Sequence, residues 1–509
     1  MDSKTKRIAQ NTFFMTLRMF FLMIVTFFMS RVVLDKLGVE DFGIYNLISS
    51  LAVSFTFFSS ALTNATQRFV TIELAKNNIQ SASKIFNQHL LVYTIISAVV
   101  ILCSEFIGSW LIGNKLNVPD DRIIASHIVF QFAILTVIVS LLSIVFESLI
   151  ISHEDMKIYS YVGVIEGVLK LCVAYAIIIS PIDKLVFYAA LMAIIFLISR
   201  AIYCVYCFRK YKECYLQYVW DKALIKKSSQ FIGWNVLSSA QVAICDQGIS
   251  ILLNMFFGPI ANAARGITSQ VGGAVFKFVN SFLVAIQPQM VKSYAQNDIV
   301  YLKKLFYTTS RLSYIVLWLF ACPIVIAAED ILNLWLVNVP MWTADMVRIS
   351  MISSCVYVLS KPIWFIVIAD GKLKKYTIIT SVVSFMLFPL SYIVLQAGGN
   401  PLSVYFLNVA LVIANIFFQL RIIEKMIHIE YSEYIKSVLI QIIGMSVISF
   451  FVGYYTYGMM KDCFNTSLLS IGSVSLITAI LTFILGTTIN EKKIVISKIS
   501  TFLIKNKKR

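Results

Sequence analysis

Charged side chains stand inside long apolar runs of this chain, where they could bind a charged ligand. The basic ones are Arg18, Lys170, Arg200, Lys277 and Lys361, and the acidic ones are Glu105, Glu166 and Asp246. A charge in hydrocarbon is unfavourable unless it is paired or hydrated. Glu166 and Lys170 are four residues apart and can neutralise one another on a helix, while Arg200 can extend to the membrane surface. Arg18, Lys277 and Lys361 have no such local partner, so we expect them to line a polar cavity that suits an anion.

Polar side chains also follow one face of several predicted helices. At about 100° per residue, a single face collects Tyr45, Ser49, Ser60 and Gln67 in one run, Arg265, Ser269, Asn280 and Gln287 in a second, and Asn235, Ser239 and Asp246 in a third. Small polar residues at helix–helix interfaces are the alternative explanation. We expect a water-filled cavity lined by these faces and by the first apolar run of the chain, residues 11–33. Arg265 and Lys170 are further cationic candidates there, and Asp246 and Glu166 are candidates for binding a coupling ion.

The elements that position these residues are transmembrane helices. Hydrophobic residues make up 59% of the 509 residues and charged residues only 14%, and the mean hydropathy is +0.82. Runs of about twenty apolar residues can cross the bilayer, and backbone polar groups in lipid require helices here. We predict about fourteen spans, near 11–33, 43–63, 88–112, 124–150, 158–180, 184–207, 230–256, 263–287, 307–327, 346–368, 376–396, 402–423, 434–458 and 467–488.

The distribution of basic residues predicts the orientation of these spans. The net charge is +17, and Lys and Arg gather at 4–7, 209–227, 372–375 and 492–509. The intervening loops on the other side hold few basic residues: Lys36, Lys115, Arg122, Lys184 and Lys461. Cytoplasmic loops are enriched in Lys and Arg, so both termini should be cytoplasmic. The same rule explains the basic excess without nucleic acid as a partner.

An internal repeat divides the chain. Residues 37–86 and 257–306 align without a gap at an offset of 220, and share Gly38/Gly258, Ser49/Ser269, Ala65/Ala285, Gln67/Gln287, Ala75/Ala295, Asn77/Asn297, Ile79/Ile299, Lys84/Lys304 and Phe86/Phe306. Internal repeats are typical of transporters, whose two halves move about a shared site. We predict an N-terminal six-helix bundle (1–207), a basic cytoplasmic linker (208–229), a C-terminal six-helix bundle (230–424), and two extra helices with a basic cytoplasmic tail (425–509).

Catalytic, metal and cofactor sites are not indicated. The nine cysteines are scattered, and Cys204 and Cys207 have no second pair or nearby histidine to complete a zinc set. The four histidines lie far apart. The acidic residues Asp35, Glu40 and Asp41 are similar to the acidic loop of membrane glycosyltransferases, but the large outer domain usual in those enzymes is missing. We expect a non-enzymatic protein without a cofactor.

Two short segments carry a resemblance to a known family. The segment 36–45 (KLGVEDFGIY) and its repeat counterpart 257–266 (FGPIANAARG) resemble the entries into the second and eighth spans of Wzx-type polysaccharide flippases. Those belong to the MOP superfamily, with the MATE drug exporters and the lipid II flippases. Wzx proteins usually have twelve spans and lipid II flippases fourteen, so the resemblance leaves the subfamily open.

The resemblance implies both a mechanism and a substrate. Two bundles would open alternately to each side of a bacterial inner membrane. They would move an undecaprenyl-pyrophosphate-linked oligosaccharide, the repeat unit of O-antigen, capsule or exopolysaccharide, from the inner to the outer leaflet. Its partners would be this lipid, membrane lipids, and the polysaccharide polymerase and glycosyltransferases of the pathway. The alternative is a MATE-type ion-coupled drug or cation antiporter, for which acidic rather than basic cavity charges are expected.

Overall fold

The structure is a computed structural model that describes residues 3–54, 59–153, 155–180, 183–222, 245–370, 373–427, 429–464, 467–487 and 492. Within these ranges every regular element is a helix and none is a strand. The chain divides into two compact units. Unit 1 contains residues 1–267 and 335–341, and unit 2 contains residues 268–334 and 342–509.

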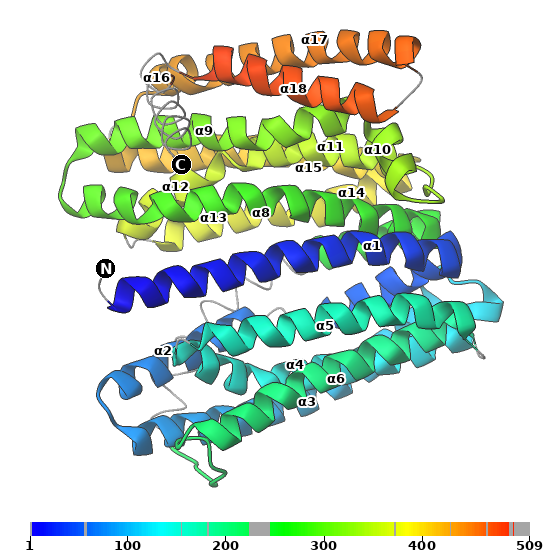
Figure 1. The fold of residues 1–509 in the computed structure, drawn as a ribbon, viewed down its shortest axis with the longest axis vertical. Coiled ribbons are helices and arrows are strands. Elements are labelled where there is room, and N and C mark those ends of the chain that lie inside the picture. Colours follow the sequence, from blue (N-terminus) through cyan, green and yellow to red (C-terminus); the bar gives the residue numbers. More distant parts are fainter. Residues whose placement is uncertain are drawn as a thin grey trace, which may run out of the picture. The chain divides into compact units, whose positions relative to one another are not determined.

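Unit 1 is built from long helices that pack lengthwise on one another (Figure 1). They are α1 (Ser3–Ser54), α2 (Ser59–Ala75), α3 (Ile79–Asn114), α4 (Ile123–Ser152), α5 (Met156–Ala176) and α6 (Lys184–Lys210), with 3-10 turns η1 (Asp120–Arg122) and η2 (Ile177–Ile179). Residues 245–257 are also helical and belong to this unit. The main packing partners are α4 with α6, α1 with α5, and α3 and α2 with α4.

Unit 2 contains most of α8 (Pro259–Ala295) and all later helices except the end of α10. These are α9 (Ile299–Ile326), α10 (Ala328–Trp335), α11 (Thr343–Tyr357), α12 (Ser360–Asp370), α13 (Leu373–Phe385), α14 (Leu387–Gln396), α15 (Pro401–Ile427), α16 (Tyr431–Tyr434), the π-helical turn η3 (Ile435–Leu439), α17 (Ile440–Phe464) and α18 (Ser467–Gly486). The last two helices pack on each other and on α9 (Figure 1).

The backbone repeats at the predicted offset of 220 residues. Gly38 and Gly258 both have a positive φ, 83° and 73°, and each stands where one helix turns into the next. Glycine adopts this conformation without the strain that a Cβ atom introduces. Asn77 and Asn297 both have a φ of 56°, a left-handed conformation that asparagine tolerates better than most residues. The internal repeat is therefore confirmed.

The helices that follow these asparagines begin in the same way. Asn78 accepts a hydrogen bond from the backbone N–H of Ser81, and Asp298 accepts one from the backbone N–H of Tyr301, both at 3.0 Å. A side-chain oxygen at the N-cap satisfies one of the unpaired N–H groups of the first turn. The repeat thus extends to the capping of α3 and α9.

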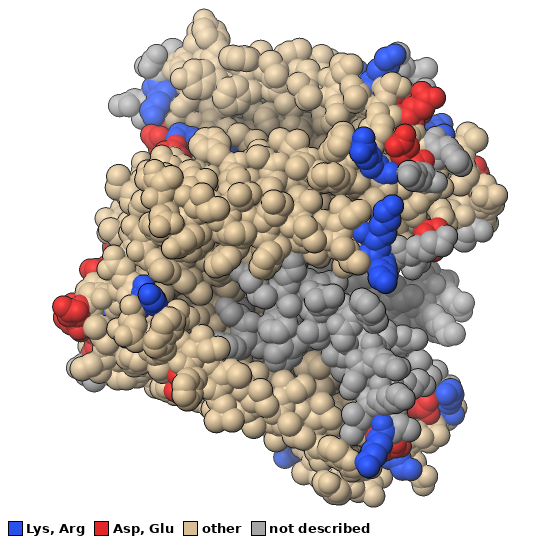
Figure 2. All heavy atoms as spheres, turned by 180° about the vertical axis from the view of Figure 1, so that it is seen from behind, with Lys and Arg blue, Asp and Glu red and all other residues tan. Residues whose placement is uncertain are grey.

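Among the described residues, ten helices are long and apolar enough to cross a membrane, by length and composition. They correspond to the predicted spans 3 to 6 and 9 to 14. Predicted span 1 lies in α1, span 2 covers the end of α1 and the start of α2, and span 8 lies in α8; residues 55–58 of span 2 and 230–244 of span 7 lie outside the described residues. The face shown in Figure 2 has its described charged side chains gathered toward the helix ends, with other residues between them. The protein is an all-helical multi-pass membrane protein, and the count of fourteen stays a prediction.

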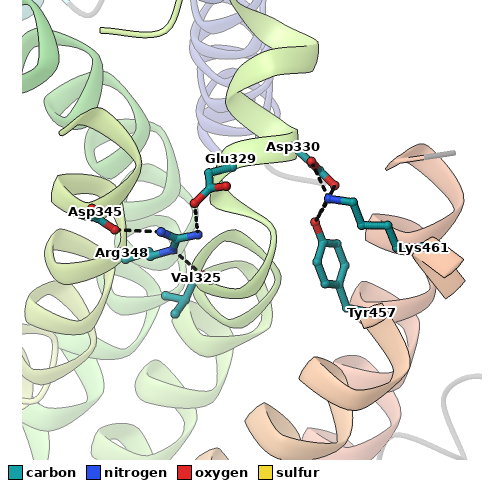
Figure 3. Close-up of polar contacts among 7 residues, drawn as sticks. All are labelled: Val325, Glu329, Asp330, Asp345, Arg348, Tyr457 and Lys461. Atoms are coloured by element: carbon teal, nitrogen blue, oxygen red, sulfur yellow. Dashed lines mark hydrogen bonds and ion pairs between the residues drawn. The ribbon is translucent and has the colours of Figure 1, made fainter. Parts of the chain in front are cut away.

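Polar contacts fix α17 along unit 2. At one end, Asp330 of α10 pairs with Lys461 (3.1 Å) and accepts a hydrogen bond from the Tyr457 hydroxyl (Figure 3). Near the middle, the Trp318 indole N–H donates to the Ser449 hydroxyl at 2.8 Å. The two extra C-terminal helices are therefore an integral part of unit 2.

The neighbouring acid on α10, Glu329, pairs with a residue of a different helix, α11. Glu329 pairs with Arg348 of α11 at 3.0 Å, and Arg348 also pairs with Asp345 at 2.8 Å (Figure 3). The consecutive carboxylates Glu329 and Asp330 thus connect α10 to two helices, α11 and α17.

Three carboxylates surround one guanidinium in unit 1. Arg122 pairs with the buried Asp41 at 3.0 Å, with Asp183, and more distantly with Asp121. Burial raises the pKa of Asp41 to about 6; Arg122 opposes this shift, and the other nearby carboxylates add to it. Asp41 therefore has a structural partner in Arg122.

Candidate functional site

Unit 1 contains a partly open cavity lined by α1, α4, α5 and α6. Its volume is about 220 Å³. At roughly 30 Å³ per water molecule, it has room for about seven waters, and it is smaller than a typical pocket for a drug-sized ligand, roughly 300 Å³ or more. Its polar lining consists of Tyr45, Ser49, Thr136, Glu166 and Lys170. The structure thus brings two predicted stripe residues together with the predicted ion pair.

The ion pair in this cavity is formed within one helix. Lys170 Nζ lies 2.6 Å from Glu166 Oε1, one turn apart on α5, and the side chains keep 30% and 19% of their exposed area. Neutralisation and partial hydration make two charges tolerable at this position. Lys170 is less suited to hold a large anion because its ammonium is already paired with the Glu166 carboxylate.

A second polar group completes the wall of the cavity. Tyr45 packs against Tyr188 of α6, with ring centroids 4.6 Å apart, and its hydroxyl hydrogen-bonds with Ser49 and Tyr188. Polar side-chain atoms away from bulk solvent are usually hydrogen-bonded. The predicted polar face of α1 is therefore engaged with α6 at this point.

Arg265, at the start of α8, also has an acidic partner. Its guanidinium lies 2.5 Å from the Asp246 carboxylate and 2.9 Å from the Ser250 hydroxyl. Asp246, Ser250 and Arg265 all belong to unit 1. The predicted cation and the predicted ion-binding acid are thus bound to each other.

Lys361, on α12 in unit 2, is held by aromatic rings. Its ammonium lies 5.0 Å from the centre of the Tyr357 ring and 5.5 Å from that of Phe276. Cation–π contacts of this kind stabilise an ammonium without neutralising it. Among the described side chains, no carboxylate forms an ion pair with Lys361. Lys277, next to Phe276 on α8, is exposed.

The other predicted residues are placed as follows. Ser269 and Asn280 are exposed on α8, and Gln67 and Gln287 are half-buried on α2 and α8. Arg18 and Ser60 belong to α1 and α2, but their side chains lie outside the described part of the structure, as do Asn235 and Ser239 entirely. Whether these polar faces line one cavity stays a prediction.

One half-buried ion pair was missed by the sequence reasoning. Arg200 of α6, expected to extend to the surface, instead pairs with Glu147 of α4, and its guanidinium lies 4.6 Å from the centre of the Phe196 ring. Glu147 stands near the end of the apolar run 124–150, so an embedded acid could have been recognised there. Among the described residues, no group of three or more His, Cys, Asp or Glu side chains could hold a metal ion.

Comparison with known proteins adds the family. The sequence pattern of the family described as "Polysaccharide biosynthesis protein" matches residues 8–296, more than half of the chain. The chain belongs to the polysaccharide biosynthesis protein family. This family match and the fold confirm the resemblance predicted from the two short segments. No curated protein sequence matches the chain.

Solved structures show which fold this family member shares. It is similar to the lipid II flippase MurJ in an inward closed conformation, with a TM-score of 0.69, 12% identity, and coverage of 92% of this chain and 98% of that one. It is also similar to a multidrug resistance MATE family transporter of the MOP superfamily in an inward-facing conformation, with a TM-score of 0.69, 10% identity, and coverage of 79% of this chain and 94% of that one. For a MATE family transporter in an outward-facing conformation the TM-score is 0.59 at 11% identity, with coverage of 82% of this chain and 96% of that one. The fold is that of the MOP transporters.

Proposed function

We propose that the protein is a flippase that moves an undecaprenyl-pyrophosphate-linked oligosaccharide from the inner to the outer leaflet of a bacterial inner membrane. The observation that carries this proposal is the match to the polysaccharide biosynthesis family on a MOP transporter fold. A flippase moves a lipid by changing which side its cavity faces, and no catalytic residue is needed. The two predicted six-helix bundles would supply that movement.

The charges of the described side chains favour an anionic substrate. Lys170 and Arg265 are neutralised by Glu166 and Asp246, whereas Lys361 keeps its charge beside aromatic rings. Lys361 is therefore our candidate for binding the pyrophosphate, and Lys277 and Arg18 stay candidates from the sequence alone. Arginine suits bidentate phosphate contacts and lysine acts as a point charge. An inside-negative potential then favours outward movement by about 2.3 kcal/mol per charge per 100 mV.

Glu166 is the better of the two candidates for ion coupling. Both carboxylates are ion-paired, Glu166 with Lys170 and Asp246 with Arg265, but Glu166 lines the small cavity of unit 1 and Asp246 does not. A proton on Glu166 would release Lys170 and change the charge of the cavity. The Glu166→Gln variant should then flip substrate at a rate that no longer responds to a pH gradient, while the Asp246→Asn variant should keep that response. Equal responses of both variants and the wild type would reject coupling at Glu166.

Reconstituted protein tests the main proposal. In vesicles, the protein should move a fluorescent polyprenyl-pyrophosphate oligosaccharide between leaflets, measured as the fraction accessible to a membrane-impermeant quencher. Loss of the gene should abolish surface polysaccharide in the host. Export of a cationic dye against a proton or sodium gradient, without movement of the lipid, would instead support the MATE-type antiporter.

A further inference from the structure

The division between the two compact units falls inside one continuous helix. Unit 1 ends at Ile267 and unit 2 begins at Thr268, but α8 runs unbroken from Pro259 to Ala295. The first turns of α8 therefore pack with the first half of the chain, and the rest of α8 packs with the second half.

Close contacts hold those first turns in unit 1. A Cβ atom added to Gly43 of α1 would stand 2.1 Å from the Pro259 carbonyl oxygen, and one added to Gly266 would stand 2.9 Å from the Asn46 amide oxygen. The first distance, to a backbone atom, is too short for a real side chain, so α1 and the start of α8 approach closely because position 43 is glycine. At position 266 the nearest atom is the end of the Asn46 side chain, which can move. Asn46 and Gly266 are repeat equivalents, 220 residues apart.

The helix contains two consecutive glycines shortly after the division, Gly272 and Gly273. Among the described residues, close packing gives no reason for glycine here. A Cβ atom at Gly273 would meet none of their atoms within 4 Å, and one at Gly272 would meet only Met351 and Ser350 at 3.7 and 3.8 Å, which are ordinary contact distances. Glycine inside a helix is unfavourable relative to alanine. The first repeat has Ala52 and Val53 at these two positions.

Since packing does not require these glycines, we infer that Gly272 and Gly273 are the hinge of α8. Residues 259–267 stay with unit 1, while the part of α8 beyond Gly273 turns with unit 2. Helix bends occur where glycines weaken the helix, and hinges are a few residues that absorb a change of backbone angles. This inference rests on the proposed flippase function, which requires the two units to change position.

The hinge lies between two of the basic residues considered above. Arg265 is on the unit 1 side, fixed to Asp246 and Ser250. Lys277 is on the unit 2 side, one turn beyond Gly273. Bending of α8 therefore changes the position of Lys277 relative to Arg265 without breaking the ion pair that holds Arg265.

Replacing both glycines by alanine tests the hinge. Each change should favour the straight helix roughly fivefold, about 1 kcal/mol, so the Gly272→Ala/Gly273→Ala variant should reduce the bent population about thirtyfold. The structure accommodates both methyl groups, so the variant should fold. The matched control is Gly444→Ala/Gly458→Ala in α17, where added Cβ atoms also meet nothing within 4 Å.

Spin labels measure the movement independently of the substrate. In a variant without native cysteines, one pair of labels replaces Ile179 and Ala397 at the predicted outer side, and a second pair replaces the exposed Leu216 and Val300 at the inner side. Pulsed electron spin resonance should show two distances for each pair in the wild type. The α8 variant should retain one of them, with flipping about thirtyfold slower, and the α17 control should behave as the wild type.

The outcomes separate the hinge from the proposed function. An α8 variant with the wild-type distance distributions and flipping rate would overturn the hinge, and so would a single distance in the wild type. If the α8 variant loses one distance but the wild type moves no lipid-linked oligosaccharide, the hinge is supported and the proposed function fails.

Discussion

Removing the charge of Lys361 should weaken substrate binding without unfolding the protein. In the Lys361→Met variant, a flexible apolar side chain of similar length replaces the lysine beside Tyr357 and Phe276, so the packing on these rings is largely kept. The lost cation–π contacts correspond to roughly 1 kcal/mol, and the melting temperature should fall by only a few degrees, about 2–4 °C per kcal/mol for large domains.

The expected loss of binding is larger than the loss of stability. A hydrogen bond to a charged group contributes roughly 1.5–3 kcal/mol, so removing one ammonium–phosphate contact should raise the half-saturating substrate concentration roughly 10- to 150-fold. Lys361→Arg keeps the charge and should be affected less. Lys304→Met removes an exposed charge from the same unit and is the matched control.

The assay is the initial rate of flipping in vesicles as the density of fluorescent polyprenyl-pyrophosphate oligosaccharide is varied. The melting temperature of each variant is measured in parallel. If Lys361→Met melts like the wild type and reaches half-saturation at the same substrate density, Lys361 does not contact the substrate, and our interpretation of the unneutralised charge is wrong.

Three other predictions concern packing, a buried carboxylate and membrane orientation. Gly43→Ala should destabilise the protein by roughly 1–3 kcal/mol, because the new Cβ atom would stand 2.1 Å from the Pro259 carbonyl oxygen. In the control Gly113→Ala the new Cβ atom would meet no described atom within 4 Å, so this variant should melt as the wild type. An equal effect of both changes would contradict the contact between Gly43 and Pro259. Since burial raises the pKa of Asp41 from 3.8 to about 6, the folded state holds this proton more tightly, so stability should fall as the pH rises from about 4 to 6 and then level off; Asp41→Asn should melt with a smaller slope, and an unchanged slope would refute the shift. Reporter fusions after Lys375 and Arg509 should indicate the cytoplasm and fusions after Gly113 and Pro340 the outside, and a C-terminus on the outer side would exclude an even number of spans.

Local features of the fold could be predicted from the sequence. The apolar runs indicated helices because backbone groups in lipid must be paired within the helix. The repeat was readable because Gly38/Gly258 and Asn77/Asn297 are residues that tolerate a positive φ, and the structure gives them that conformation. The repeat could be recognised because the same backbone conformation requires the same residue type in both halves.

Among the charged residues, the local ion pair could be predicted and the pairs between distant residues could not. The Glu166–Lys170 pair follows from helix geometry, since residues four apart lie on the same face, and the structure forms it. The partners of Arg200 and Arg265 lie 53 and 19 residues away. Only helix packing brings such groups together, so their neutralisation was not predicted.

What the sequence by itself determined is the class of protein, its repeat, its family and the set of embedded charges. The tertiary structure decided which charges are neutralised, since Lys361 faces rings while Arg265 faces a carboxylate. It also placed the division between the compact units inside α8. The physical reason is that an apolar run and a glycine act through their own backbone, whereas an ion pair between helices depends on which faces the packing brings together.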